Sequence, residues 1–386
     1  SEGRATHVAG LRAPERHTLE IELSRPVFTF RYVLAMNFAD AVPRELFPRG
    51  ASPPAAALVG SGPYRIAEWR RGLGYRFTRN PHYAGSDGLV EGVDLMIGGE
   101  ASSAAMMLER GELDRVNADP PTRLRFQRDP RLRPWMHRVT PMDVGYLFLN
   151  TEMKPFNDVR VRRAVSHAVD RARVVGLTAG QCVPADGIVP SAMPWSNPGR
   201  PEYPFDPERA RALLREAGLP DGFATELWYI QSRAVDQRIA AGLQQDLAAL
   251  GIRLDLRSVS YPAFESKVRR RGEAACGIWG WLQDYPDPST FLDTLLNGDR
   301  IQGGGGNNQA YYNNPAFNRC VNEAASLMDA AARLRLFREA EDLAMRDAPW
   351  VPLYHEQYSV IRSPRLRGDV PHPVWLWRYE TMWLAE

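Results

Sequence analysis

Alternating apolar and polar positions predict strands in the first part of the chain. The segment HTLEIELS places Leu19, Ile21 and Leu23 on one side of a half-buried strand. In PYRIAEWRRGLGYRFTRNPHY, two short alternating runs flank Gly72 and Gly74, which predicts a β-hairpin. The apolar run VGYLFLN further along predicts another strand. Sheet structure is therefore expected from the beginning of the chain.

Apolar residues spaced three and four positions apart predict four helices. Asn157 or Asp158 can cap one of them, because a short polar side chain there accepts a backbone N–H of the first turn. Asp206 caps another, with Pro207 at the first helical position and Gly218 at the end. The four predicted helices span residues 101–114, 157–175, 206–218 and 330–347.

The stretch from 224 to 259 predicts a β-α-β unit. ATELWYI, DQRIAAGLQQDLAALG and IRLDLRSV give strand, helix and strand in that order, which implies parallel strands with a right-handed crossover. A second unit follows, with YPAFESKVRRRG as its helix and ACGIWGW as a buried strand. The strands WVPLYHE and YSVIRS come near the end of the chain. These elements predict an α/β chain with mixed sheets.

Composition narrows the class of protein. The chain has 386 residues, which favours two packed lobes over one domain. Its net charge is +2, from 48 Lys and Arg against 46 Asp and Glu, so nothing favours nucleic acid as the partner. Three widely spaced cysteines form no disulfide framework. No stretch approaches the roughly 18 consecutive apolar residues of a membrane helix. The opening SEGRATHVAG carries no signal peptide, so these residues alone do not define the compartment.

Familiar catalytic and metal-binding patterns are missing from the sequence. The seven histidines form no HExxH, and none stands beside a cysteine or carboxylate cluster at ligand spacing. There is no GxSxG elbow and no Ser-x-x-Lys. GGGGN lacks the Lys-Ser/Thr ending of a phosphate loop, so a flexible or tight loop is the better interpretation. The sequence therefore indicates binding without turnover, and no cofactor or metal is expected.

Five stretches, read in order, carry more specific patterns. GSGPYRIAEWRRGLGYRFTRNPHYAG stands at 60–85, and YLFLNTEMKPFNDVRVRRAVSHAVDRARVV follows at 146–175. GWLQDYPDPSTFLDTLL, NNPAFNRCVNEA and DAPWVPLYHEQY come next. Together they resemble the peptide/nickel-type family, family 5, of bacterial extracellular solute-binding proteins, the receptors of ATP-driven importers. The resemblance runs in family order from about residue 10 to the C-terminus.

The resemblance implies a periplasmic-binding-protein-like fold, with two α/β lobes of mixed sheets joined by a hinge. We expect a partial first lobe at 1–148, a second lobe with β-α-β units at 149–355, and a return to the first lobe at 356–386. The hinge crossings are expected near 146–151 and 353–359. Family members carry a substantial front portion that this sequence lacks. The first lobe is therefore expected to be incomplete, with an exposed sheet edge or apolar face.

The implied function is the capture of a small peptide or similar solute and its delivery to the membrane permease of an ABC transporter. Such a protein would be periplasmic or a cell-surface lipoprotein and would not be an enzyme. A ligand-sensing module of a transcriptional regulator is the alternative, because the same binding module can follow a DNA-binding head. An unrecognised enzyme is a third reading.

Asp284 is the candidate carboxylate for the ligand. It follows the Trp-rich run GIWGWLQ and has no basic residue beside it. In the peptide-binding members that this stretch resembles, this Asp holds the ligand's α-ammonium group and the nearby Trp, here Trp281, lines the cleft. Trp279 is assigned to the core, on the expectation that the two tryptophans cannot both face the cleft. The alternatives for Asp284 are capping the next helix or pairing with an Arg of its own lobe, although Asp287 is the better cap.

Arg233 is the candidate partner for a ligand carboxylate. It lies in IQSRAVD, after a predicted strand and before a helix, where open α/β sheets collect ligands. In dipeptide-binding relatives, an Arg in the comparable loop holds the C-terminal carboxylate, which suits its bidentate geometry. The alternative is an ordinary surface arginine. Tyr229 and Tyr285 are expected to contribute aromatic surface to side-chain pockets.

Overall fold

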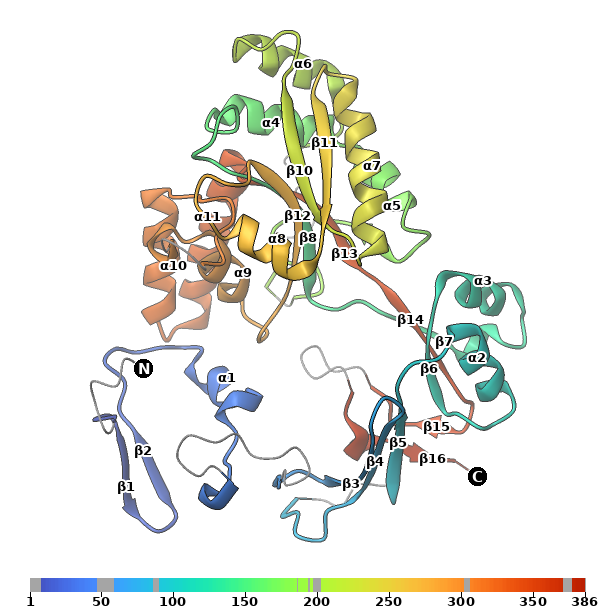
Figure 1. Ribbon diagram of the computed structural model, residues 1–386. Helices are drawn as coiled ribbons and strands as arrows, with labels where there is room; N and C mark the ends of the chain where they lie inside the picture. The colour runs from blue at the N-terminus through green and yellow to red at the C-terminus, as the bar shows by residue number, and fades with distance from the viewer. Residues whose placement is uncertain are drawn as a thin grey trace.

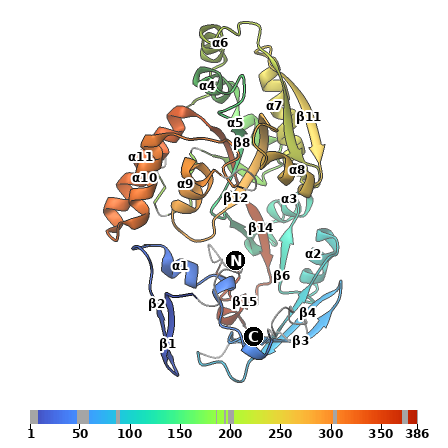
Figure 2. The same cartoon turned by 60° about the vertical axis from the view of Figure 1, so that its left-hand side comes forward.

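The chain folds into two bodies (Figure 1). We call residues 143–356 the upper body, and the described residues before and after them the lower body. The two bodies are equally distinct in a view turned by 60° (Figure 2). The computed structural model describes residues 8–46, 59–85, 90–185, 187–193, 195–196, 203–301, 306–370 and 377–385.

A six-stranded mixed sheet forms the centre of the upper body, in the order β11-β10-β12-β8-β13-β9. β10 is parallel to both β11 and β12, whereas β8 is antiparallel to β12 and β13. The parallel pairs confirm the two predicted β-α-β units. The strands are β8 (Asp143–Leu149), β9 (Cys182–Pro184), β10 (Ala224–Ile230), β11 (Arg253–Val259), β12 (Cys276–Leu282) and β13 (Trp350–Glu356).

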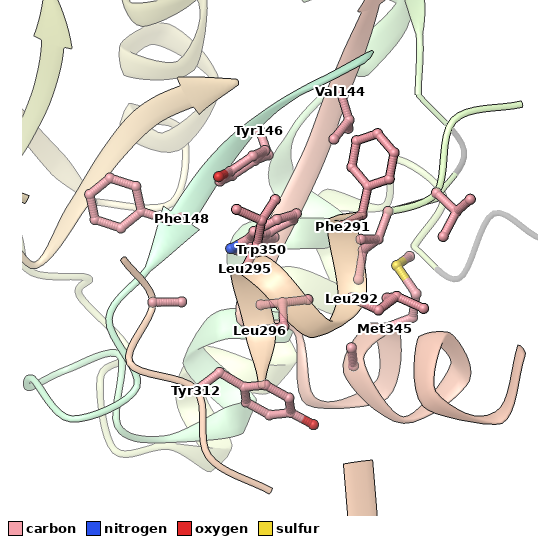
Figure 3. Packing of buried hydrophobic residues seen from close by; sticks show 14 of the residues in the cluster. Val144, Tyr146, Phe148, Phe291, Leu292, Leu295, Leu296, Tyr312, Met345 and Trp350 are labelled. Atoms are coloured by element: carbon pink, nitrogen blue, oxygen red, sulfur yellow. The ribbon is translucent and has the colours of Figure 1, made fainter. Parts of the chain in front are cut away.

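β8 is buried along its whole length and contributes to two separate cores. Tyr146 points to one face of the sheet, where its ring stacks on Trp350 with 3.5 Å between centroids (Figure 3). Leu147 points to the other face, because side chains alternate along a strand. Helices cover both faces, so an apolar strand at the centre is what the packing requires.

The helices divide between the two faces. The Leu147 face is covered by α4 (Val159–Ala168), α5 (Arg171–Gly176), α6 (Pro207–Glu216) and α7 (Ala234–Ala248). The Tyr146 face is covered by α8 (Tyr261–Val268), α9 (Ser289–Leu296), α10 (Pro315–Ser326) and α11 (Ala330–Asp347).

The single helix predicted at 157–175 is wrong, since the structure has two. Asp158 caps α4 by accepting the Arg160 N–H at 2.8 Å. The backbone is extended at Asp170, which caps α5 by accepting the Arg173 N–H at 3.0 Å. A second N-cap inside an apolar-periodic stretch therefore restarts the helix in a new direction.

The lower body consists of small antiparallel sheets and short helices. β6 (Arg115–Ala118), β14 (Tyr358–Arg362) and β7 (Met136–Val139) form one sheet, which packs with α2 (Ala101–Glu109) and α3 (Pro120–Arg128). β3 (Tyr64–Arg70), β4 (Gly74–Arg79) and β5 (Gly92–Met96) form another, and β3–β4 is the predicted hairpin. The remaining elements are β1 (Leu11–Glu15), β2 (Thr18–Ile21), α1 (Phe30–Leu34), β15 (Leu366–Arg367) and β16 (Trp383–Leu384).

Large apolar side chains are exposed on the lower body. Leu19 lies in β2, the strand predicted to be half buried, yet its side chain is 66% exposed. Leu73 is also 66% exposed, and Phe38 is 71% exposed. An exposed apolar surface was expected in this part of the chain. Local alternation predicted the strand, but what covers a strand depends on contacts that local sequence does not specify.

The chain passes between the bodies at two places. β13 leads into β14 through Gln357, inside the predicted crossing at 353–359. The other passage runs through 140–142, between β7 and β8. The crossing predicted at 146–151 is therefore wrong. The first residues of that range belong to β8, an apolar strand at the buried centre of the six-stranded sheet.

The upper body also contains a buried ion pair. Arg333 Nη1 donates to Asp287 Oδ2 at 2.8 Å, and the two side chains are 1% and 0% exposed. A second bond joins Arg333 Nη2 to Asp287 Oδ1 at 3.2 Å. The pair connects the loop after β12 to α11.

Replacing Asp287 by Ala should destabilise the fold by about 3–5 kcal/mol, because it leaves the Arg333 charge buried without its partner. Urea denaturation followed by circular dichroism measures the change. Glu208→Ala is the control, since Glu208 is 83% exposed in its pair with Arg211 and should cost less than about 1 kcal/mol. Equal costs for the two variants would contradict the prediction.

Candidate functional site

Functional chemistry gathers at one edge of the six-stranded sheet. β10, β11, β12 and β13 run in the same direction and end there. Arg233 follows β10, Tyr261 follows β11, Asp284 follows β12, and Glu356 ends β13. Asp143 begins the antiparallel β8 at the same edge. The edge faces the lower body, because β13 continues from it into β14 (Figure 1).

A pocket of about 390 Å³ lies at this edge. Its volume is in the range of small-molecule binding sites. Three of the five residues predicted for the ligand site line it, namely Asp284, Trp281 and Arg233. The full lining is Ile230, Arg233, Tyr261, Trp279, Gly280, Trp281, Leu282, Gln283 and Asp284.

Asp284 is half buried and is held by a hydroxyl group. Thr290 Oγ1 donates to Asp284 Oδ2 at 3.2 Å and accepts the Asp284 backbone N–H at 3.1 Å. Among the residues that the structure describes, no cationic side chain pairs with this carboxylate. Burial therefore raises the pKa of Asp284 above its ordinary value of 3.8, and the bond from Thr290 offsets only part of the shift.

The alternative roles expected for Asp284, helix capping and pairing with an arginine, belong instead to Asp287, three residues further on. Asp287 Oδ1 accepts the Ser289 N–H at 3.0 Å at the start of α9, and the same carboxylate pairs with Arg333. Asp284 makes neither contact. Of these two aspartates, the one in the pocket is thus the one to which the described part of the chain supplies no counter-charge.

Trp279 and Trp281 both line the pocket, which corrects the expectation that only one could face it. Residues two apart on a strand point to the same side, so the predicted alternation was misapplied. Trp279 is 5% exposed and stacks on Phe264 with 5.1 Å between centroids, so its assignment to the core agrees with the structure. Trp281 is less buried, and its indole N–H donates to Thr290 Oγ1 at 3.4 Å.

Arg233 lines the pocket but already has partners. Its Nη2 donates to Glu356 Oε1 at 3.0 Å, and its Nε lies 3.6 Å from Asp236 Oδ2. Burial alone would lower the pKa of Arg233, but the negative charges of Asp236 and Glu356 outweigh it and the net shift is upward. An ordinary surface arginine would have neither the burial nor the two carboxylates.

A group of carboxylates stands behind Arg233. Asp143 accepts the Glu356 backbone N–H through both oxygens, at 3.1 and 3.0 Å. Burial, with the nearby Glu356 charge adding to it, raises the pKa of Asp143 to about 7. Burial also raises the pKa of Asp236 to about 6, against the opposing charge of Arg233. The single guanidinium of Arg233 thus lies near two buried acids, Asp143 and Asp236, in addition to Glu356.

Tyr285 and Tyr229 do not line the pocket. Tyr285 stacks on Tyr32 of α1, with 5.7 Å between centroids, so it contacts the lower body directly beside Asp284. Tyr229 is 7% exposed and packs in the core on the Leu147 face. Its neighbour Ile230 points to the opposite face and reaches the pocket.

Several lining residues, including Tyr261 and Gln283, were not predicted from the sequence. Tyr261 is 50% exposed and begins α8, directly after β11. The rule that selected Arg233, a position after a parallel strand, also applies to Tyr261 and would have found it. Gln283 stands next to Asp284, and no pattern marked it.

The described residues contain neither a metal-binding cluster nor a membrane-spanning helix. No group of three or more His, Cys, Asp and Glu side chains is placed to hold a metal ion in that part of the chain. Within the same residues, no helix combines the length and apolar character needed to cross a membrane.

Comparison with known proteins identifies the family. The sequence model described as "Bacterial extracellular solute-binding proteins, family 5 Middle" matches residues 2–303. The chain belongs to this family. The resemblance drawn from five short stretches is thereby confirmed, and solute binding, not catalysis, is the activity for which the family is named.

Relatives of this solute-binding protein are distant but extensive. Heme-binding protein A of Haemophilus influenzae is 28% identical over 370 residues, which cover 92% of this chain and 66% of that protein. The probable D,D-dipeptide-binding periplasmic protein DdpA of Escherichia coli is 26% identical over 369 residues, 94% of this chain and 70% of its own length. The chain thus spans about two thirds of the length of these relatives.

A solved structure confirms the fold of this solute-binding protein. Clavulanic acid biosynthesis oligopeptide binding protein 2 superposes with a TM-score of 0.90 at 26% identity, covering 98% of this chain and 72% of that one. The predicted α/β fold, with the two lobes of a periplasmic binding protein, is therefore confirmed.

Replacing Asp143 by Asn should stabilise this solute-binding protein more at about pH 8 than at about pH 5. The folded chain keeps the Asp143 carboxyl protonated up to about pH 7, whereas its ordinary pKa is 3.8. Because folding raises the pKa of Asp143, its protonated carboxyl contributes stability at low pH. That stability is lost as the pH rises from the ordinary pKa of 3.8 to the folded value of about 7. The difference in Tm between variant and wild type, measured by differential scanning fluorimetry at both pH values, checks this. The same difference at both would contradict it.

Proposed function

We propose that this protein is the substrate-binding component of an ABC importer. It captures a small peptide or similar solute in the pocket at the sheet edge and delivers it to a membrane permease. The single observation that carries this proposal is Asp284, a half-buried carboxylate in an aromatic pocket that pairs with no cationic side chain of the described residues. Relatives named for binding heme and D,D-dipeptides, and a neighbour named for oligopeptides, support solute capture.

The proposed mechanism couples ligand capture to closure of the lobes. An ammonium group beside Asp284 supplies the missing charge, and each charge-assisted hydrogen bond contributes about 1.5–3 kcal/mol. Micromolar affinity requires about −8 kcal/mol, so the charge pair needs the aromatic surface of Trp281 and Tyr261 in addition. We place the hinge at the two passages between the bodies, residues 140–142 and Gln357.

A periplasmic or cell-surface position, lipid-anchored in the latter case, is where such a receptor meets its solute. We propose no catalytic role for the pocket. None of the similarities found favours the ligand-sensing module of a transcriptional regulator.

Asp284→Asn should weaken binding of an ammonium-bearing peptide at least about tenfold, which corresponds to about 1.4 kcal/mol. The amide keeps the bond from Thr290 but removes the negative charge. Isothermal titration calorimetry with trialanine measures the affinity. Asp255→Asn is the control, because it removes an equal charge from a side chain that is 60% exposed on β11. Equal effects of the two variants would sink the proposal.

Affinity for the same peptide should fall as the pH is lowered. Ligand binding favours the ionised carboxylate, and the pKa of Asp284 lies above 3.8, so protonation competes with the ligand already above that pH. Titrations between about pH 7 and pH 4 should show this loss in the wild type. The Asp284→Asn variant, which has no proton to gain there, should show a smaller dependence. Parallel curves would speak against the role of Asp284.

A further inference from the structure

The charges around Arg233 define a narrower class of ligand. Resting on the proposed function, we propose that the pocket selects solutes with a cationic group for Asp284 and an uncharged acceptor, not a carboxylate, beside Arg233. C-terminally amidated peptides and other amine-bearing amides have this chemistry. The inference assigns Arg233 a role different from the carboxylate binding expected from sequence.

The Arg233 guanidinium is already balanced by two carboxylates. Glu356 accepts from Nη2 at 3.0 Å, and Asp236 lies 3.6 Å from Nε. The side chain of Asp236 is 0% exposed and its carboxylate also accepts from the Tyr354 hydroxyl at 3.4 Å. Asp236 is therefore fixed in place, and the positive charge that a ligand carboxylate would need is already in use.

Displacing Glu356 would not make room for an anion. Asp143 accepts the Glu356 backbone N–H through both oxygens, so a third acidic group, with its pKa raised to about 7 by burial, stands behind the pair. A ligand carboxylate that took the place of Glu356 at Arg233 would stand beside the buried Asp236 and, above about pH 7, beside an ionised Asp143 as well. Like charges in a desolvated region repel strongly, because the local dielectric screens them less than water does.

One part of Arg233 remains suited to an uncharged group. A Cβ added at Gly280 would lie 3.8 Å from Nη1, so this nitrogen approaches the pocket wall that Gly280 forms. Nε and Nη2 face the carboxylates instead. An N–H from a charge-balanced guanidinium suits a carbonyl oxygen, whereas Asp284, elsewhere in the same lining, remains the place for positive charge.

Three forms of trialanine test the inference on the full chain by calorimetry. They are the free peptide, its C-terminal amide and its N-acetyl form. We expect the amide to bind at least about tenfold more tightly than the free peptide, and the N-acetyl form to bind more weakly than both. Equal affinity of amide and free peptide, or a preference for the free peptide, would overturn the inference.

Glu356→Gln releases Arg233 from one partner and should change the selectivity. The preference for the amide over the free peptide is expected to fall at least about tenfold in this variant. Glu226→Gln is the matched control, since Glu226 is 43% exposed, pairs with Arg257 and does not line the pocket. The same preference in both variants would show that Glu356 does not block a ligand carboxylate.

Small ions separate this inference from the proposed function. If no form of trialanine binds, peptide capture fails, and thermal shifts at matched ionic strength decide the inference. Ethylammonium should raise the Tm of the wild type but not of Asp284→Asn, and propionate should raise the Tm of Glu356→Gln but not of the wild type. Equal stabilisation of wild type and Glu356→Gln by propionate would overturn it.

Discussion

The buried ion pair of Asp287 with Arg333 anchors the loop after β12, and this loop carries the pocket carboxylate Asp284. Two aspartates stand three residues apart in this loop. Asp287 is bonded twice to Arg333 and also accepts the Ser289 N–H, so it anchors the loop at the start of α9. Asp284 is thereby positioned at the pocket, where the Thr290 hydroxyl is its only side-chain partner among the residues that the structure describes. A binding site needs a rigid support and a charged group that can still pair with a ligand. Asp287 provides the support in this loop, and Asp284 provides the charged group.

The sequence predicted the features that depend on neighbouring residues, such as secondary structure. It did not predict contacts between side chains that lie far apart in the chain. The β-α-β units followed from local periodicity, and the family resemblance pointed to Asp284, which lines the pocket. Arg233 was found too, but its pairing with Glu356 joins residues 123 positions apart, which no local pattern contains. Tyr229 was misplaced because β10 is covered by helices on both faces, so its apolar run does not show which side chains reach the edge.

The pocket adjoins the β13–β14 passage on one side and a direct contact between the two bodies on the other. Glu356 ends β13, one residue before Gln357 leads into β14, so the Arg233 pair joins the pocket wall to the strand crossing. On the other side, Tyr285 stacks on Tyr32 of the lower body. Phe28 adds a second contact there, with the Arg333 guanidinium 3.9 Å from its ring centroid. Movement of one body against the other would therefore alter the surroundings of the pocket on two sides.

Capture drives closure only if the ligand interacts differently with the open and closed arrangements. In the proposed mechanism Asp284 meets this condition, because approach of the lower body at Tyr285 would remove water from the carboxylate next to it. Without a cation, that loss of water opposes closure, as the raised pKa of Asp284 already indicates for its half-buried state. With an ammonium group in place, the same loss strengthens the attraction between the two charges. The ligand thus reverses the sign of the Asp284 contribution to closure, which a permanently paired carboxylate such as Asp287 could not do.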